Sequence, residues 1–160
     1  MPENKQNKVF QKIPMKLSTR IRHSLRIMIE VASDTSGRPV LARNIAEMQE
    51  ISEPYVDQIL LPLRTHKLLV SVRGRSGGYR LARTAKEITL LDVVQAMEGN
   101  VQLADCLADP KECKRSATCV TRYVWAMLTE NLKRDMKSVN LADLVVKQAK
   151  LCAPTTDYTI

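Results

Sequence analysis

A basic, glycine-rich segment between two short apolar stretches most constrains the fold of this chain. The six residues from Arg73 to Gly78 hold three of the five glycines and two arginines. The flanking stretches, Leu68 to Val72 and Tyr79 to Leu81, have the length and composition of short strands. Glycine permits positive φ and lets the backbone approach another surface closely. The segment therefore predicts a hairpin whose exposed tip is suited to contact phosphate.

Helical periodicity dominates the residues before this hairpin. Apolar residues recur at helical spacing in three segments: Ser18 to Ala32, Leu41 to Gln49, and Ser52 to about His66. In the third segment, Ser52 is placed to cap the helix, with Pro54 in the first turn. Pro62 lies inside this segment and is expected to kink the helix or loosen its last turn.

The same periodicity predicts which faces of these helices are buried. The expected apolar residues are Ile21, Leu25, Met28 and Ile29 in the first helix, Ile45 and Met48 in the second, and Val56, Ile59, Leu60 and Leu63 in the third. The opposite face of the third helix holds Pro54, Asp57, Gln58, Leu61 and Thr65. That helix therefore has one buried face and one face left for solvent or a partner.

Further helices are expected after the hairpin. Thr89 is placed to cap a helix through Glu98, with Gly99 as its stop signal. Residues 100–117 are polar and aperiodic, which predicts a loop. A long helix is expected over 118–137, with an apolar stripe of Val120, Val124, Met127, Leu128, Leu132 and Met136, and a last helix over 140–150.

Composition limits the class of protein. Apolar residues make up 44% of the 160 residues and aromatic residues only 4%, which indicates small α-rich domains with an aliphatic core. No apolar run reaches the roughly 18 residues needed to span a bilayer. The polar residues 1–14 lack the apolar middle of a signal peptide. We expect a cytoplasmic protein with no membrane partner, a disordered extension at 1–14 and a tail at 153–160.

The positive charge is concentrated in one half of the chain. Residues 1–90 hold 16 Lys and Arg against 8 Asp and Glu, a balance of +8, whereas residues 91–160 hold 9 of each. A one-sided basic balance indicates a polyanionic partner, most often nucleic acid. A solvated basic surface without a partner explains the charge alone equally well.

Three cysteines lie close together in the aperiodic stretch. Cys106, Cys113 and Cys119 fall within fourteen residues, while Cys152 lies near the end. The six and five intervening residues are longer than the two to four typical of zinc pairs. Thiolates favour an iron–sulfur cluster, which takes four ligands. Reduced thiols without a metal remain the alternative.

Three helices followed by a two-stranded basic hairpin is the order of a winged helix-turn-helix domain. The motifs that carry a family resemblance are Met15 to Ser18, Tyr55 to Leu60 with Leu63-Arg64, Val70 to Gly74, Gly77 to Tyr79, Ile88 to Leu90 with Asp92 to Val94, and the three cysteines. In these motifs the chain resembles the bacterial winged-helix regulators that include IscR, NsrR, RirA and CymR. The resemblance covers roughly residues 15–151.

The resemblance implies a mainly α fold with a small β wing, made of a winged helix-turn-helix domain and a long dimerisation helix. Residues 15–99 would form the DNA-binding domain, 100–119 the cysteine-bearing cluster loop, and 118–152 the dimerisation and C-terminal helices. The implied assembly is a homodimer on a palindromic operator in double-stranded DNA. The alternative for the long helix is that its stripe packs only on its own domain.

The resemblance also implies which residues contact DNA. Asp57 and Gln58 would read bases, because a carboxylate accepts from cytosine and glutamine pairs with adenine. Arg73 and Arg75 would enter the minor groove or touch phosphate from the wing. The full set is Lys16, Ser18, Arg20, Ser52, Tyr55, Asp57, Gln58, Arg64, Arg73, Arg75, Ser76 and Gly77.

Members of the family with this loop bind a 2Fe–2S or 4Fe–4S cluster whose fourth ligand varies. Arg122 stands where IscR-like members have a ligating histidine, and Arg22 where NsrR-like members have an aspartate. Arginine does not ligate iron. His23, from the partner subunit, is the tentative fourth ligand beside the metal ligands Cys106, Cys113 and Cys119. The other candidates are water, a small thiol, or the loop carboxylates Asp105, Asp109 and Glu112.

The expected function is a transcriptional regulator that senses redox, iron or nitric oxide status through the cluster. A cluster-free repressor that responds to a metabolite or a partner protein is the alternative. A small iron–sulfur electron carrier does not need the basic wing. An enzyme is not expected, because the chain has two histidines and no phosphate loop, HExxH motif or nucleophile elbow.

Overall fold

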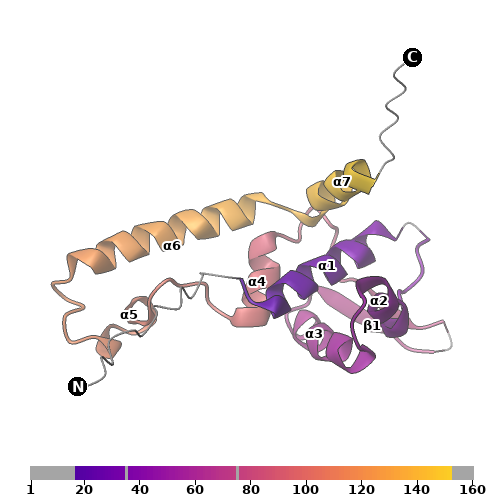
Figure 1. Ribbon diagram of the computed structural model, residues 1–160, viewed down its shortest axis with the longest axis horizontal. Helices are drawn as coiled ribbons and strands as arrows, with labels where there is room; N and C mark the ends of the chain where they lie inside the picture. Colours follow the sequence, from indigo (N-terminus) through magenta and orange to yellow (C-terminus); the bar gives the residue numbers. More distant parts are fainter. Residues whose placement is uncertain (1–16, 35, 75, 153–160) are drawn as a thin grey trace, which may run out of the picture.

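Helices make up most of the chain in the computed structural model, which describes residues 17–34, 36–74 and 76–152 (Figure 1). The elements are α1 (Thr19–Ser33), α2 (Ala42–Gln49), α3 (Glu53–Thr65), β1 (Leu69–Val72), β2 (Gly78–Leu81), α4 (Leu90–Glu98), α5 (Asp105–Ala108), the 3₁₀ helix η1 (Pro110–Glu112), α6 (Val120–Ser138) and α7 (Leu141–Cys152). The mainly α fold with a small β wing is confirmed. The extension at 1–14 and the tail at 153–160 lie outside the described residues.

The core lies where α1, α2, α3 and α4 meet. The third helix buries the expected stripe, Val56, Ile59, Leu60 and Leu63. The prediction for α2 is half wrong, because Ile45 is buried whereas Met48 is 48% exposed. The buried residues of α2 are Ile45, Ala46 and Gln49. Small Ala46 allows close packing on that side, so Met48 is turned toward solvent.

Side-chain caps fix where several helices begin. The Ser18 hydroxyl accepts from the backbone N–H of Ile21 (3.2 Å) at the start of α1. At the start of α4, Thr89 and Asp92 form a reciprocal capping box, with each side chain accepting from the other residue's backbone N–H. A cap of this kind contributes about 1 kcal/mol to helix stability. These local signals explain why the expected helix starts agree closely with the structure.

The wing is a two-stranded antiparallel sheet that is joined to the rest of the domain. Leu69 pairs with Leu81 and Val72 with Gly78. Two backbone hydrogen bonds of 2.8 Å also join Val40 to Tyr79. Gly78 has φ +144°, and a Cβ there would lie 2.5 Å from the carbonyl oxygen of Val40. Glycine is therefore required at this position so that the wing can lie against the residues before α2.

The segment between α4 and α6 is not the irregular loop that was expected. It contains the one-turn helix α5 and the 3₁₀ helix η1. The Asp109 carboxylate accepts from the backbone N–H of Lys111 (2.9 Å), which starts η1. Elements of three or four residues are too short to show periodicity. The long helix also begins two residues later than expected, at Val120, with Cys119 as its cap residue.

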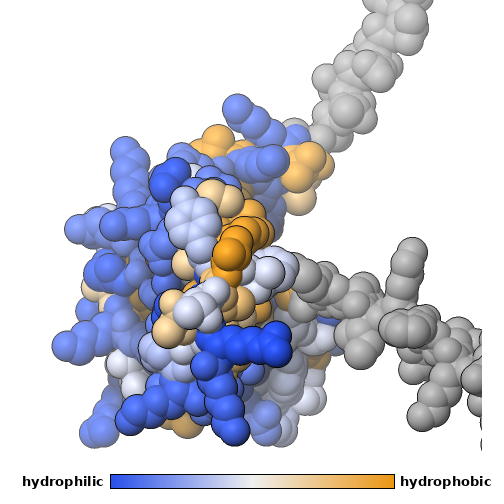
Figure 2. All heavy atoms as spheres, turned by 90° about the vertical axis from the view of Figure 1, so that its left-hand side faces the viewer, coloured by the Kyte–Doolittle hydropathy of each residue, from blue (hydrophilic) through white to orange (hydrophobic). Residues whose placement is uncertain are grey.

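Helix α6 is only partly covered by the rest of the chain. Figure 1 shows α6 extending beyond α4, with α5 near its first turns. Near its end, Leu132 packs against the core and Met136 is buried. Its first turns expose an apolar face made of Val120, Tyr123, Val124, Trp125, Met127 and Leu128. Viewed from the side where α6 begins, Figure 2 shows an orange patch bordered by hydrophilic atoms.

Among the described residues, no helix combines the length and apolar character needed to cross a lipid bilayer.

Candidate DNA-binding face and cysteine segment

The outer face of α3 carries the residues expected to read DNA bases. The side chains of Asp57 and Gln58 are exposed, and neither bonds to another residue that the structure describes. The buried stripe of α3 holds the helix against the core from the opposite side. This packing gives the outer face a fixed position and leaves its polar groups available to a partner.

A hollow of about 520 Å³ beside α3 brings together predicted contact residues from two helices. Arg20 of α1 and Tyr55 and Gln58 of α3 line it, as does Leu61. A second hollow, of about 370 Å³, lies between α3 and β1 and includes Leu61 and Arg64. The fold therefore places Arg20, Tyr55, Gln58 and Arg64 along one continuous surface.

Two serines predicted to contact DNA lie in different settings. The Ser18 hydroxyl donates to Glu98 Oε1 (2.6 Å) while it caps α1. Its hydroxyl is thus already bonded within the chain and ties the start of α1 to the end of α4. Ser52 is exposed at the start of α3, and its side chain makes no capping bond. The hydroxyl of Ser52 is therefore available to a phosphate.

Of the described wing residues predicted to contact DNA, two are exposed and one is buried. Arg73 and Ser76 are exposed. Gly77 is buried, and a Cβ there would lie 2.4 Å from the carbonyl oxygen of Val72. This steric requirement explains the glycine without any DNA contact. Two further predicted residues, Lys16 and Arg75, lie outside the described residues.

The three loop cysteines occupy different parts of the segment between α4 and α6. Cys106 lies in α5, Cys113 follows η1, and Cys119 precedes α6. All three are free thiols and partly exposed. Within residues 17–34, 36–74 and 76–152, no three Cys, His, Asp or Glu side chains are close enough to hold one metal ion. The donor types fit an iron–sulfur cluster, whereas this arrangement of the segment does not gather them.

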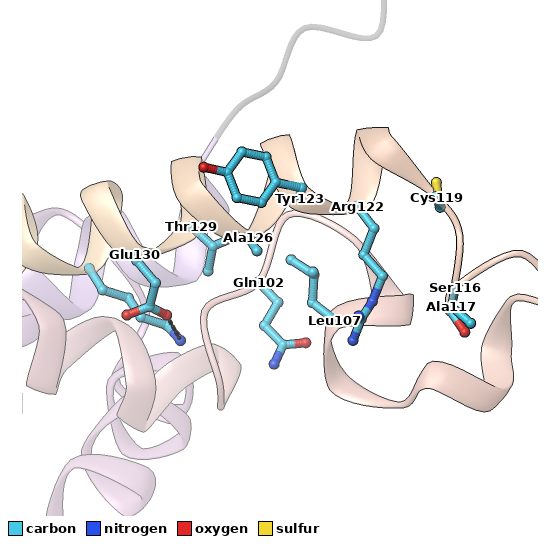
Figure 3. Close-up of a pocket in the computed structure, with 11 residues that line it drawn as sticks. Gln102, Leu107, Ser116, Ala117, Cys119, Arg122, Tyr123, Ala126, Thr129 and Glu130 are labelled. Atoms are coloured by element: carbon cyan, nitrogen blue, oxygen red, sulfur yellow. Dashed lines mark hydrogen bonds and ion pairs between the residues drawn. The ribbon is translucent and has the colours of Figure 1, made fainter.

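Arg122 connects the cysteine segment to α6. Its Nε donates to the backbone carbonyl of Cys106 (3.1 Å). The side chain reaches from α6 toward Leu107, across a pocket of about 440 Å³ (Figure 3). The backbone N–H of Leu103 also donates to the buried Thr129 hydroxyl (3.3 Å). These bonds hold the segment against α6 at two places. Both join residues far apart in the sequence, so no local pattern predicted them.

The thiol of Cys119 has a lowered pKa because of the groups that surround it. A hydrogen bond with the Thr121 hydroxyl (3.0 Å) lowers the pKa of Cys119 below its ordinary value. Bonds from the backbone N–H groups of Arg122 and Thr121 and the charge of Arg115 lower it further, whereas burial acts in the opposite direction. The thiolate, which is the reactive and metal-binding form, is therefore favoured here.

His23 lies in α1, beside α3. Its ring packs edge-on against Tyr55, with 5.5 Å between ring centroids. Burial, followed by the charges of Arg26 and Arg22, lowers the pKa of His23. Its Nδ1 is buried, with no partner among the described residues. The lowered pKa favours the neutral ring. His23 is not grouped with the cysteines of its own chain, so a role as fourth ligand stays a prediction that depends on a partner subunit.

A helix with an exposed polar face, basic residues beside it and a glycine-turned wing define the fold of a winged helix-turn-helix regulator. The family model described as Rrf2, iron-dependent transcriptional regulator, matches residues 17–147. The chain belongs to the Rrf2 family of transcriptional regulators. The family resemblance expected from the motifs is confirmed, and so is the expectation that the chain is not an enzyme.

Individual relatives agree with this assignment. Protein rrf2 of Nitratidesulfovibrio vulgaris is 36% identical over 138 residues, which cover 86% of this chain and 91% of that protein. The structure of CymR, described as the global cysteine regulator of B. subtilis, has a TM-score of 0.68 and 31% identity, covering 84% of this chain and 98% of that one. IscR of T. potens has a TM-score of 0.67 and 32% identity, with coverages of 84% and 88%.

Proposed function

We propose that this chain is a homodimeric regulator that binds a palindromic operator and senses redox, iron or nitric oxide status through an iron–sulfur cluster. The DNA-binding part depends chiefly on one observation. The outer face of α3 exposes Asp57 and Gln58, unbonded within the described chain, beside Arg20 and Arg64. Polar groups of this kind on a helix that fits the major groove are suited to read base edges.

The surrounding charges supply the contact to the DNA backbone. Arg20 and Arg64 flank the reading face, and Arg73 lies at the wing. In this proposal these cations bind phosphate, as does the Ser52 hydroxyl at the start of α3. Each phosphate that is neutralised releases counterions, so affinity should fall steeply as the salt concentration rises.

The apolar face of α6 supports the dimer. Val120 is 78% exposed and Tyr123 is 72% exposed, on a helix whose last turns are already packed. Burial of apolar surface contributes about 25 cal/mol per Å². Two such faces packed against each other would remove this surface from water and set the distance between the two α3 helices, as a palindromic operator requires.

The cluster would be held by Cys106, Cys113 and Cys119, with His23 of a second subunit as the tentative fourth ligand. When bound, a 2Fe–2S or 4Fe–4S group would supply iron–thiolate bonds that oxidants and nitric oxide attack. The thiols are not gathered in this arrangement. Loading would therefore require the segment to move and the bond between Arg122 and Cys106 to change.

Such a movement has a route to the DNA-binding domain. Glu98, the last residue of α4, accepts from Ser18 at the start of α1. The cysteine segment follows α4 after Gly99, and Leu103 is bonded to Thr129 of α6. In this proposal, a change in the segment shifts both the start of α1 and the position of α6. Regulation requires that one cluster state prefers one of these positions.

A cluster-free regulator is the second candidate, because Arg122 holds the backbone of Cys106 and a pocket of about 440 Å³ lies beside it. Anaerobic purification with a visible spectrum and iron and sulfide assays separates the two. We expect a brown protein with acid-labile sulfide, whose colour is lost in Cys113→Ser and kept in the control Cys152→Ser. A colourless protein after anaerobic reconstitution would leave the second candidate.

A further inference from the structure

Leu61 is an unusual residue on the outer face of α3. Its side chain is 61% exposed, more than any other large apolar side chain described before α4. It lies one helical turn after Asp57 and Gln58, on the same face. It also lines both hollows beside α3, so it forms a ridge between them. An apolar ridge therefore stands on a surface that is otherwise polar and basic.

Two polar groups next to this ridge, the Thr65 hydroxyl and the His66 ring, lie within hydrogen-bond distance of backbone carbonyls of α3. The Thr65 hydroxyl donates to the backbone carbonyl of Leu61 (3.0 Å). The His66 ring nitrogen Nδ1 lies 3.0 Å from the carbonyl oxygen of Pro62, a donor position when that nitrogen is protonated. Pro62 itself adds apolar surface and has no N–H. The end of the reading face is consequently apolar rather than polar.

The core of the domain does not need this side chain. The buried stripe of α3 is already complete on the opposite face. Contact with an apolar group of a partner would remove this exposed side chain from water, which is favourable. Arg20 and Arg64 line the hollows on either side of the ridge. Positive charge on both sides points to a polyanion rather than to an apolar protein surface.

We propose that Leu61 selects a thymine in the operator by contacting its 5-methyl group. The inference rests on the proposed function, in which α3 enters the major groove. The thymine methyl is the apolar group that base edges present there. Cytosine at the same place offers an amino group and no methyl, which would leave that donor against a leucine side chain.

The position of Leu61 relative to Gln58 determines which neighbouring base pairs the two side chains face. Three residues of helix rise by about 4.5 Å, close to the roughly 3.4 Å between successive base pairs. Gln58 and Leu61 thus face adjacent base pairs when α3 lies along the groove. With glutamine pairing to adenine, each half-site contains an adenine and a thymine in neighbouring pairs.

Uracil substitution tests the methyl contact directly. The full-length protein first selects its preferred duplex from a random-sequence pool. Each thymine of one half-site is then replaced by deoxyuridine, which removes only the methyl group. We expect one thymine whose replacement weakens binding about fourfold, the change that corresponds to one methyl-sized group. Leu61→Ser should bind the unmodified duplex and the duplex with uracil at that position equally tightly. Replacement of the other thymines should affect this variant as it affects the unmodified protein.

Met48→Ala is the matched control, because Met48 is an exposed apolar residue of α2. It should keep the uracil profile of the unmodified chain. The inference is overturned if no thymine is sensitive, if the sensitivity persists in Leu61→Ser, or if that variant changes the oligomeric state in size-exclusion chromatography. Failure of the proposed function gives a different result, since no duplex would then be enriched from the pool.

Discussion

The guanidinium of Arg122 connects helix α6 to the segment that carries the three cysteines. Arg122 lies on α6, and its Nε holds the backbone carbonyl of Cys106 in α5. An arginine cannot ligate iron, so its contribution at this place is a hydrogen bond. At the residue scale, the cysteine segment is therefore held against α6 in part by a bond that one substitution can remove.

Arg122→Ala should loosen the cysteine segment while the rest of the fold is kept. A hydrogen bond of this type is worth about 1 kcal/mol, so amide exchange of residues 104–113 should accelerate about fivefold. Hydrogen–deuterium exchange of the metal-free protein measures this. Arg134→Ala, at an exposed position of the same helix, is the control. Equal exchange in both variants would contradict a holding role for Arg122.

Thr121→Val should raise the pKa of the Cys119 thiol. The Thr121 hydroxyl is the largest cause of the lowered pKa at this cysteine. The thiolate forms as pH rises through that pKa, so alkylation of the metal-free protein should begin at a lower pH than for an ordinary cysteine. In the variant, the midpoint for iodoacetamide labelling of Cys119 should move to higher pH. Site-resolved mass spectrometry measures it, and an unchanged midpoint would contradict the assignment.

Helix α4 lies between the helices that precede the wing and helix α6. It packs against α1, α3 and α6. Its first residue, Leu90, donates its backbone N–H to the carbonyl of Val139, just before α7 (2.9 Å). Its last residue, Glu98, bonds to Ser18. At the scale of elements, α4 therefore links the positions of α1 and α3 to those of the cysteine segment and α6.

Thr89→Ala removes half of the capping box that starts α4. The expected loss is about 1 kcal/mol of unfolding free energy, which lowers Tm by about 3 °C. Thermal unfolding of the metal-free protein at fixed concentration measures it. Thr118→Ala is the control, since that exposed side chain makes no bond within the described residues. A decrease of the same size in both variants would contradict the capping role.

The whole molecule combines a basic domain with a helix that extends beyond it. The excess positive charge belongs to residues 1–90, which include the recognition helix and the wing. The first turns of α6, in contrast, expose an apolar face (Figure 2). This separation is suited to a protein whose two ends contact different partners.

Leu128→Asp should dissociate the proposed dimer. A carboxylate on the apolar face of α6 would be buried without a partner in the interface, which costs several kcal/mol. Sedimentation velocity at micromolar concentration should then show the mass of a single chain. Met48→Asp adds the same charge at an exposed apolar residue of α2, outside α6, and should leave the dimer intact. A monomer before any substitution would contradict the dimer itself.

Much of the fold could be predicted because its signals are local. The stripe Val56, Ile59, Leu60 and Leu63 repeats within one helix, and the Thr89 cap needs only the residue three places later. The exposure of Met48 was not predicted, because a short helix allows two similar stripes and packing selects one. The candidate base-reading residues were predicted only with the family motifs, and their DNA contacts stay predictions.

The sequence by itself determined the longer helices, the caps of α1 and α4, the hairpin turn and the basic half of the chain, since each depends on residues close together or on composition. Only the tertiary structure decided which distant groups meet: Arg122 with Cys106, Val40 with Tyr79, and Ser18 with Glu98. The tertiary structure also decided which apolar surface stays exposed, including Leu61 and the first turns of α6. Such pairings depend on how whole elements pack, and no local pattern encodes that.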